Sequence, residues 1–213
     1  MPFAFPKVYP ILDASFIPST GRAEFLHRLG LSLTDAGITL LEYRNKTGAE
    51  TEILTDSAIL RASMPSGRTK LILDDRADLV DRAGFDGVHV DAGDISPAQA
   101  RSLLGPDRIV GTFGGSEALL PGILEAPVDY LAVGPVFETR TKQTAKEPIG
   151  IDGVRRLREE AGLGKVLSAA AGVTLETAKA VLDAGASMVA VSEAIFHTPD
   201  PAVTFSQWVR QLR

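Results

Sequence analysis

Charged residues alternate at the end of the second apolar run of this sequence. Glu42, Arg44 and Lys46 are spaced two apart, so an extended strand points all three to one side. Two neighbouring cations suit a multiply charged anion, because each supplies hydrogen-bond donors as well as charge. A solvated strand end accounts for the same residues equally well, so the pattern needs support from elsewhere in the chain.

Two aspartates follow the next two apolar runs. Asp75 ends the run that begins at Lys70, and Asp94 follows Gly87–Val90. If these runs are neighbouring parallel strands, their backbones lie about 4.8 Å apart, and the carboxylates repel each other unless a cation lies between them. An oxygen-only pair suits Mg²⁺. Helix or turn capping is the alternative, and it is the commoner role for Asp91 or Asp94 alone.

The segment from Gly134 to Lys142 reads GPVFETRTK and is the richest in phosphate-binding groups. Thr139 and Thr141 flank Arg140, and Lys142 follows. Hydroxyls and cations of this kind donate hydrogen bonds to phosphate oxygens. A solvated basic loop is the alternative.

Small residues end the last two apolar runs. Ala171–Gly172 follows one run, and Ser192–Glu193 follows the other. Where bulky side chains are missing, a phosphate can approach backbone N–H groups directly. Glycine at a strand end more often only forms a turn, so Gly172 alone is weak evidence. The prediction of phosphate binding depends on small residues at the ends of both runs.

The three histidines and the single tryptophan are weaker candidates. We expect His27 and His197 at the surface or behind the site, and His89 as a hydrogen-bonded strand residue rather than a base. Trp208 belongs to an apolar helix face that packs on the rest of the domain. The chain has no Ser-His-Asp elbow, His-Glu-x-x-His motif or Walker loop.

Short β-branched runs alternate with segments of three- and four-residue apolar spacing along the chain, which is typical of repeated βαβ units. The expected strands are Val8–Asp13, Leu40–Arg44, Lys70–Asp75, Gly87–Val90, Arg108–Phe113, Tyr130–Pro135, Lys165–Ala171 and Ser187–Glu193. One helix is expected after each strand: Arg22–Ala36, Thr51–Met64, Asp78–Ala83, Ser96–Leu104, Ser116–Glu125, Gly153–Glu160, Leu175–Asp183 and Pro201–Leu212.

Eight such units without a linker predict the α/β class and one TIM-barrel domain, a (β/α)8 barrel over residues 1–213. An open doubly wound sheet is disfavoured, because no G-x-G-x-x-G turn follows the first strand. In a barrel, chemistry belongs at the carboxyl ends of the strands, and the loops after strands seven and eight form the usual phosphate site. The charged, hydroxyl and small residues described above as site candidates fall at such ends or in the loops that follow them.

Composition narrows the function classes. The absence of cysteine excludes a disulfide scaffold, a thiolate nucleophile and cysteine-ligated metal sites. A net charge of −5 and a pI near 5.3 argue against nucleic acid as a partner. No signal peptide or membrane-spanning stretch is recognisable, so we expect a cytoplasmic protein that does not bind membranes. The oligomeric state stays open, with a homodimer as one option.

Taken together, the motifs resemble the thiamine-phosphate synthase family, also called thiamine-phosphate pyrophosphorylases, whose sister group is the thiazole tautomerases. Residues 42–46 (EYRNK) are similar to the family's Gln-x-Arg-x-Lys, and residues 74–76 (DDR) to its Asn-Asp-Arg. Residues 87–89 (GVH) with Asp94 are similar to its Gly-Val-His and the aspartate that follows. Residues 134–142 match Gly-Pro-x-Phe-x-Thr-x-Thr-Lys, which is long enough to be specific.

The resemblance implies a transferase that joins hydroxymethylpyrimidine diphosphate to thiazole phosphate and releases pyrophosphate, with Mg²⁺ as cofactor and small phosphorylated molecules as its partners. In family terms, the diphosphate is held by Arg44, Lys46 and Lys142, Mg²⁺ by Asp75 and Asp94, and the thiazole phosphate by Thr139 and Thr141 with the backbones of Gly172, Ser192 and Glu193. No nucleophile or strong base is needed if the pyrimidine methylene carbon ionises as pyrophosphate leaves.

Four residues depart from the family pattern: Glu42 replaces Gln, Asp74 replaces Asn, Phe113 replaces Ser, and Ala171 replaces the first of two glycines. Glu42 and Asp74 add negative charge at the substrate site and weaken anion binding there unless they are protonated or salt-bridged. Phe113 can fill part of the pyrimidine pocket or stack on the ring.

Three other functions compete with the synthase. A thiazole tautomerase would carry an acid/base histidine after strand five, where this chain has Gly115. A catalytically silent phosphate-binding protein is consistent with the four departures, and turnover would separate it from the synthase. A Schiff-base aldolase needs a lysine inside the barrel, but Lys70 and Lys165 begin their strands, at the opposite face.

Overall fold

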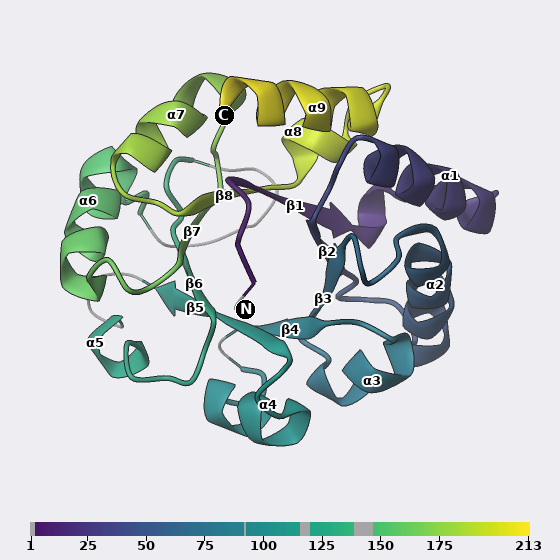
Figure 1. Cartoon of the computed structure of the whole chain (residues 1–213), viewed down its shortest axis with the longest axis horizontal. Coiled ribbons are helices and arrows are strands. Elements are labelled where there is room, and N and C mark those ends of the chain that lie inside the picture. The colour runs from purple at the N-terminus through teal and green to yellow at the C-terminus, as the bar shows by residue number, and fades with distance from the viewer. Residues whose placement is uncertain (1–2, 92, 116–119, 139–146) are drawn as a thin grey trace.

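The computed structural model of the chain is a closed barrel of parallel strands in the sequential order β1 to β8, with a ring of helices outside it (Figure 1). It describes residues 3–91, 93–115, 120–138 and 147–213. The strands are β1 (Val8–Asp13), β2 (Leu40–Arg44), β3 (Lys70–Asp74), β4 (Gly87–Val90), β5 (Ile109–Gly115), β6 (Tyr130–Val133), β7 (Leu167–Ala170) and β8 (Met188–Val191). Pairing of β1 with β8 closes the barrel, which confirms the predicted fold.

The helices of the outer ring follow the strands along the chain. They are α1 (Arg22–Asp35), α2 (Glu50–Ser63), α3 (Val80–Ala83), α4 (Pro97–Leu104), α5 (Leu120–Ile123), α6 (Gly150–Ala161), α7 (Leu175–Asp183), α8 (Glu193–Phe196) and α9 (Pro201–Gln211). Short 3₁₀ turns cover Ala14–Phe16 and Ala77–Leu79. No helix in these described ranges is long and apolar enough to cross a membrane.

Capping residues explain where two of the helices begin. Ser96 accepts a hydrogen bond from the backbone of Gln99, and the Gln99 side chain accepts one from the backbone of Ser96. Thr174 and Thr177 form the same reciprocal arrangement at the start of α7. Each pair satisfies two backbone N–H groups that lack partners in the first helical turn. The caps fix how α4 and α7 leave the loops above β4 and β7.

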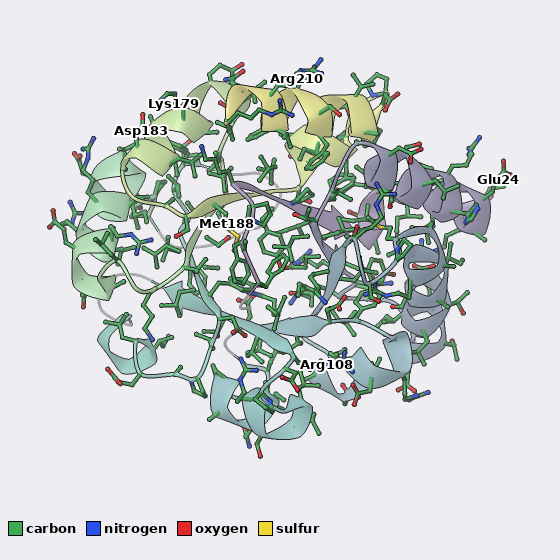
Figure 2. The ribbon with its side chains drawn as sticks, in the orientation of Figure 1. Glu24, Arg108, Lys179, Asp183, Met188 and Arg210 are labelled. Atoms are coloured by element: carbon green, nitrogen blue, oxygen red, sulfur yellow. The ribbon has the colours of Figure 1, made fainter. Side chains whose placement is uncertain are left out.

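Side-chain alternation divides the barrel interior into two layers. A lower apolar layer consists of Tyr9, Leu40, Ile72, Ile109, Tyr130, Met188 and Ala190. On β2 and β3, the inward position two residues further along is polar, at Glu42 and Asp74, and Ser168 of β7 is a further buried polar residue. Figure 2 shows Met188 near the barrel axis, whereas Glu24 and Lys179 point outward.

The N-terminal segment packs against the apolar layer. Phe5 contacts the Tyr130 ring edge-on, with 5.6 Å between centroids, and Phe3 contacts Phe5 at 5.0 Å. Figure 1 shows this segment crossing the centre of the ring. The barrel interior is therefore lined by aromatic side chains at its amino-terminal end and by polar groups at its carboxyl end.

Several predicted boundaries need correction; the strand expected to run to Pro135, for example, ends at Val133. The last strand ends at Val191 rather than Glu193, because Ser192 turns the chain into the short helix α8, which the sequence analysis did not predict. The strand expected to end at Ala171 stops one residue earlier, at Ala170. The helix expected over Ser116–Glu125 is Leu120–Ile123 in its described part, and residues 116–119 lie outside the described ranges.

Candidate active site

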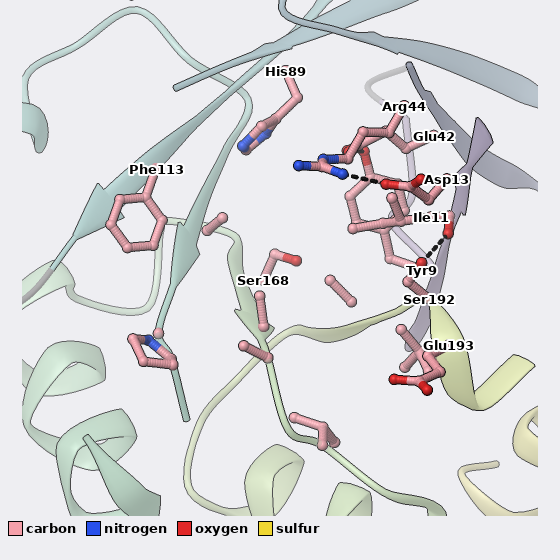
Figure 3. Close-up of a pocket in the computed structure, with 18 of the residues that line it drawn as sticks. Tyr9, Ile11, Asp13, Glu42, Arg44, His89, Phe113, Ser168, Ser192 and Glu193 are labelled. Atoms are coloured by element: carbon pink, nitrogen blue, oxygen red, sulfur yellow. Dashed lines mark hydrogen bonds and ion pairs between the residues drawn. The ribbon is translucent and has the colours of Figure 1, made fainter. Parts of the chain in front are cut away.

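A cavity of about 790 Å³ opens at the carboxyl end of the barrel (Figure 3). Residues from the ends of most strands line it, together with the start of α8. The lining includes Tyr9, Asp13, Glu42, Arg44, Lys46, Asp74, His89, Asp91, Asp94, Phe113, Gly172, Ser192 and Glu193.

A cluster of two cations and three carboxylates forms one side of the cavity. Arg44 is ion-paired with Asp13, and its Nε lies 3.4 Å from Asp74 Oδ2. Lys46 Nζ lies 3.0 Å from the same Asp74 oxygen and 2.5 Å from Asp75 Oδ1. Figure 3 shows the Arg44–Asp13 pair facing the cavity. Both cations are therefore held in place by carboxylates of the protein.

The protonation of this cluster depends on burial. Burial, followed by repulsion from Glu42, raises the pKa of Asp74 to about 7, against an opposing contribution from Lys46. Although burial opposes it, the charge of Asp74 and the hydrogen bond to Asp75 raise the pKa of Lys46. Asp74 is thus divided between its acid and its carboxylate near neutral pH, while Lys46 stays charged.

Asp75 and Asp94 approach each other at the ends of β3 and β4. Burial raises the pKa of Asp94, and contact with the Asp75 carboxyl raises it further, although a hydrogen bond from the Asp91 backbone opposes this. Asp75 has a φ of 64°, an unusual conformation for a residue with a side chain. Its backbone N–H donates to the carbonyl of His89, 2.8 Å away, which ties the turn to β4. This backbone brings the two acids together.

The two acids fit the donor set that Mg²⁺ takes in phosphate-processing sites, one or two carboxylates with the remaining ligands from phosphate and water. Carboxylates in contact repel each other, and a cation relieves that repulsion. Among the described residues, no group of three or more His, Cys, Asp or Glu surrounds a single point. A bound Mg²⁺ would therefore need oxygens from its substrate as well as from the protein.

Below the cluster, a chain of buried hydrogen bonds crosses the barrel. The Tyr9 hydroxyl donates to Glu42 Oε2 at 2.6 Å and lies 2.8 Å from the Tyr130 hydroxyl. The Tyr130 hydroxyl lies 3.0 Å from His89 Nδ1, and His89 Nε2 lies 3.6 Å from Asp91 Oδ1. Although burial opposes it, Asp91 and the charge of Glu42 raise the pKa of His89. The predicted strand histidine is thus hydrogen-bonded inside the barrel.

The residues that follow β7 and β8 also border the cavity. Ala171 and Gly172 both have a φ of 70°. A Cβ on Gly172 would lie 2.5 Å from the carbonyl oxygen of Glu138, so only glycine fits there. Ser192 and Glu193 start α8, and the Ser192 hydroxyl donates to the carbonyl of Ile11 at 2.7 Å. These loops follow β7 and β8, where barrel enzymes commonly bind phosphate.

The β2–α2 loop, which carries Lys46, is supported from behind the barrel wall. Asp56, 1% exposed, accepts hydrogen bonds from the Arg22 guanidinium and the Tyr43 hydroxyl. Asn45 donates to that hydroxyl at 3.0 Å, and its Oδ1 accepts from the backbone of Gly48 at 2.8 Å. The buried carboxylate of Asp56 therefore supports the loop through Tyr43 and Asn45, and it is not part of the cavity lining.

The structure brings most of the predicted residues together. The predicted residues that line the cavity are Glu42, Arg44, Lys46, Asp74, Asp94, Phe113, Gly172, Ser192 and Glu193. Asp75 is not part of the lining, but it is bound to Lys46, which is. Thr139, Thr141 and Lys142 lie outside the described residues. The functions assigned to all of these residues stay predictions.

Sequence reasoning missed Tyr9, Tyr130 and the pairing of Asp13 with Arg44. The available signal was strand alternation, since Tyr9, Ile11 and Asp13 share one side of β1 and all line the cavity. The weaker candidates lie where they were expected: His27 and His197 are exposed, and Trp208 is buried in α9.

Known proteins resemble this chain along most of its length. A family profile described as Thiamine monophosphate synthase matches residues 8–195. The thiamine-phosphate synthase of Koribacter versatilis is 42% identical over 187 residues, which is 87% of each chain. That of Agrobacterium fabrum is 34% identical over 186 residues, covering 86% of this chain and 84% of the relative. A solved thiamine phosphate pyrophosphorylase from Pyrococcus furiosus has a TM-score of 0.79 at 24% identity, covers 97% of this chain and 94% of its own, and supports the fold alone.

Proposed function

The chain belongs to the thiamine monophosphate synthase family, and we propose that its cavity binds both phosphorylated substrates of that activity together with Mg²⁺. The activity is that of a thiamine-phosphate synthase, a transferase that joins hydroxymethylpyrimidine diphosphate to thiazole phosphate and releases pyrophosphate. The observation that carries the assignment is 42% identity to a thiamine-phosphate synthase over 87% of both chains.

Arg44 and Lys46 would hold the diphosphate. Their charges are balanced by Asp13, Asp74 and Asp75. A diphosphate can take over part of these ion pairs, because its oxygens accept charge-assisted hydrogen bonds as carboxylates do. The two cations then lie beside the oxygen on which negative charge develops as the carbon–oxygen bond breaks. We assign Lys142 to the same anion from its sequence motif.

Asp75 and Asp94 would hold the Mg²⁺, with the substrate diphosphate and water as the remaining ligands. When bound, Mg²⁺ neutralises negative charge on the phosphate oxygens. The contact between the two acids supports this assignment, since a cation there would replace repulsion by attraction.

The thiazole phosphate would lie at the backbone of Gly172, Ser192 and Glu193, with Thr139 and Thr141 assigned from their motif. Gly172 has no room for a Cβ, so no side chain at this position stands between its backbone and a phosphate oxygen. With both substrates in one cavity, the thiazole nitrogen is held next to the carbon that loses pyrophosphate. Catalysis then comes largely from positioning and charge, and it needs no protein nucleophile.

Turnover with both substrates, at increasing Mg²⁺ concentration, tests the proposal. We expect thiamine phosphate only when Mg²⁺ is present. We expect Asp75→Asn to lower kcat/KM by about 100-fold or more, because it removes one charged metal ligand. The control Asp152→Asn, an exposed acid on α6, should behave as the unmodified chain. An unchanged Mg²⁺ dependence in Asp75→Asn would remove that residue from the metal site. Tight phosphate binding without product would point to the silent binding protein.

A further inference from the structure

The hydrogen-bonded chain beneath the cavity connects residues of four strands. Glu42 comes from β2, Tyr9 from β1, Tyr130 from β6 and His89 from β4. All four side chains are buried, from 1% exposure at both tyrosines to 8% at His89. The successive distances of 2.6, 2.8 and 3.0 Å are those of direct hydrogen bonds without intervening water. The direction of each of these three hydrogen bonds therefore constrains the direction of the next.

A carboxylate at one end gives the chain a direction. The Tyr9 hydroxyl donates to Glu42 Oε2, so its single proton is committed to that bond. The oxygen of Tyr9 then accepts from Tyr130, whose own proton is committed in turn. The oxygen of Tyr130 can only accept, and the atom beside it is His89 Nδ1. A hydrogen bond at that position therefore requires the proton to lie on Nδ1.

We propose that Glu42 is a positioning residue that, through the hydroxyls of Tyr9 and Tyr130, holds a proton on His89 Nδ1 and leaves Nε2 to face Asp91 and the cavity. The inference deepens the proposed function, because it concerns the floor of the same cavity. Tyr9 and Tyr130 are not among the residues assigned above to the substrates or to Mg²⁺.

The tautomer of His89 decides whether its Nε2 atom presents a hydrogen-bond acceptor or a donor to the cavity. With Nδ1 protonated, a neutral His89 offers a hydrogen-bond acceptor at Nε2, and a doubly protonated His89 pairs there with Asp91. Glutamine at position 42 would change this, because its amide nitrogen can donate to Tyr9. The donor and acceptor of each hydrogen bond could then be exchanged, so that Tyr130 donates to His89 Nδ1 and the ring proton lies on Nε2.

Nitrogen-15 NMR of the full-length, ligand-free protein measures the tautomer directly, because a protonated and an unprotonated ring nitrogen differ in chemical shift. The chain has three histidines, so His89→Asn assigns the signal and the other two serve as internal references. At a pH where the ring is neutral, we expect the Nδ1–H form in the unmodified protein. We expect Glu42→Gln and Tyr9→Phe each to shift the population toward Nε2–H.

Tyr43→Phe is the matched control. Tyr43 is adjacent to Glu42 in sequence and also donates to a buried carboxylate, but that carboxylate is Asp56, outside the barrel wall. Removing its hydroxyl should leave the His89 tautomer unchanged. An Nε2–H form in the unmodified protein would overturn the proposal, as would an unchanged tautomer in Glu42→Gln. If Glu42→Gln does not fold, Tyr9→Phe decides by the same criterion.

Turnover gives a second readout that separates positioning from direct contact. If Glu42 acts through the hydrogen bonds of Tyr9 and Tyr130, Glu42→Gln and Tyr9→Phe should raise the KM of the pyrimidine substrate by a similar factor, about 3- to 10-fold. The kcat should be less affected. An effect of Glu42→Gln that Tyr9→Phe does not share would show that Glu42 acts only by touching substrate, and would overturn the positioning role. The tautomer measurement needs no turnover, so its failure is distinct from a failure of the proposed activity.

Discussion

Ala171 occupies the left-handed region of backbone conformation at the edge of the cavity, with a φ of 70°. A residue with a Cβ pays about 1–2 kcal/mol there, whereas glycine does not. Because glycine also loses more entropy on folding, we expect Ala171→Gly to stabilise the protein by a net amount of about 0.5–1 kcal/mol. The free energy of unfolding in urea measures the effect.

Ala170→Gly is the natural control for this substitution, since Ala170 is the last residue of β7. Glycine in an extended strand should destabilise by about 0.5–1 kcal/mol. Equal effects of the same sign at the two positions would contradict the strain assigned to Ala171.

Asp74 should give the stability of the ligand-free protein a pH dependence. Its pKa of about 7 lies above the ordinary value of 3.8, so the folded state retains a proton that the unfolded chain has released between these values. The contribution of Asp74 to stability is therefore fully present below pH 3.8 and is lost as the pH rises through about 7. Asp74→Asn cannot titrate, so its stability relative to the unmodified chain should increase between pH 4 and 8.

The increase should not exceed about 5 kcal/mol, at about 1.4 kcal/mol per pKa unit. Urea unfolding at several pH values without metal measures it. Asp183→Asn, at an exposed position on α7, provides a comparison that should show no such trend. A constant difference between Asp74→Asn and the unmodified protein across this range would contradict the raised pKa.

At the scale of elements, the buried Asp56 joins α1, α2 and β2. It is 1% exposed and accepts hydrogen bonds from Arg22 and Tyr43. Asp56→Ala would leave both donors without their acceptor, and we expect a loss of about 3 kcal/mol in the free energy of unfolding. The exposed pair of Asp183 with Lys179 on α7 is the comparison, because Asp183→Ala should cost no more than about 0.5 kcal/mol. Similar losses at the two sites would show that burial of Asp56 adds nothing.

The longer elements and their caps could be predicted from local information. The apolar spacing of α1 and α2 and the caps at Ser96 and Thr174 depend on residues within one or two helical turns of each other. Helix α8 could not be predicted in this way, because its four residues are too few to show a periodicity. Ser192, which precedes it, lies beside β1, where its hydroxyl donates to the carbonyl of Ile11.

At the scale of the whole molecule, barrel closure determines which inward side chains meet. Alternation along β2 was enough to predict that Glu42, Arg44 and Lys46 share a side. It could not predict that Tyr9 would contact Tyr130, because 121 residues separate them and the contact crosses the barrel interior. The cation–carboxylate cluster has the same origin, since Asp13 meets Arg44 only through the register of β1 with β2.

Trp208 gives the molecule a single, well-placed optical reporter. It is 2% exposed in α9, which packs against α1 and α7, and it is not part of the cavity lining. It is also the only tryptophan in the sequence. Its fluorescence therefore reports whether the first and last helices remain docked, and it observes this from a position at which no substrate can quench it by contact.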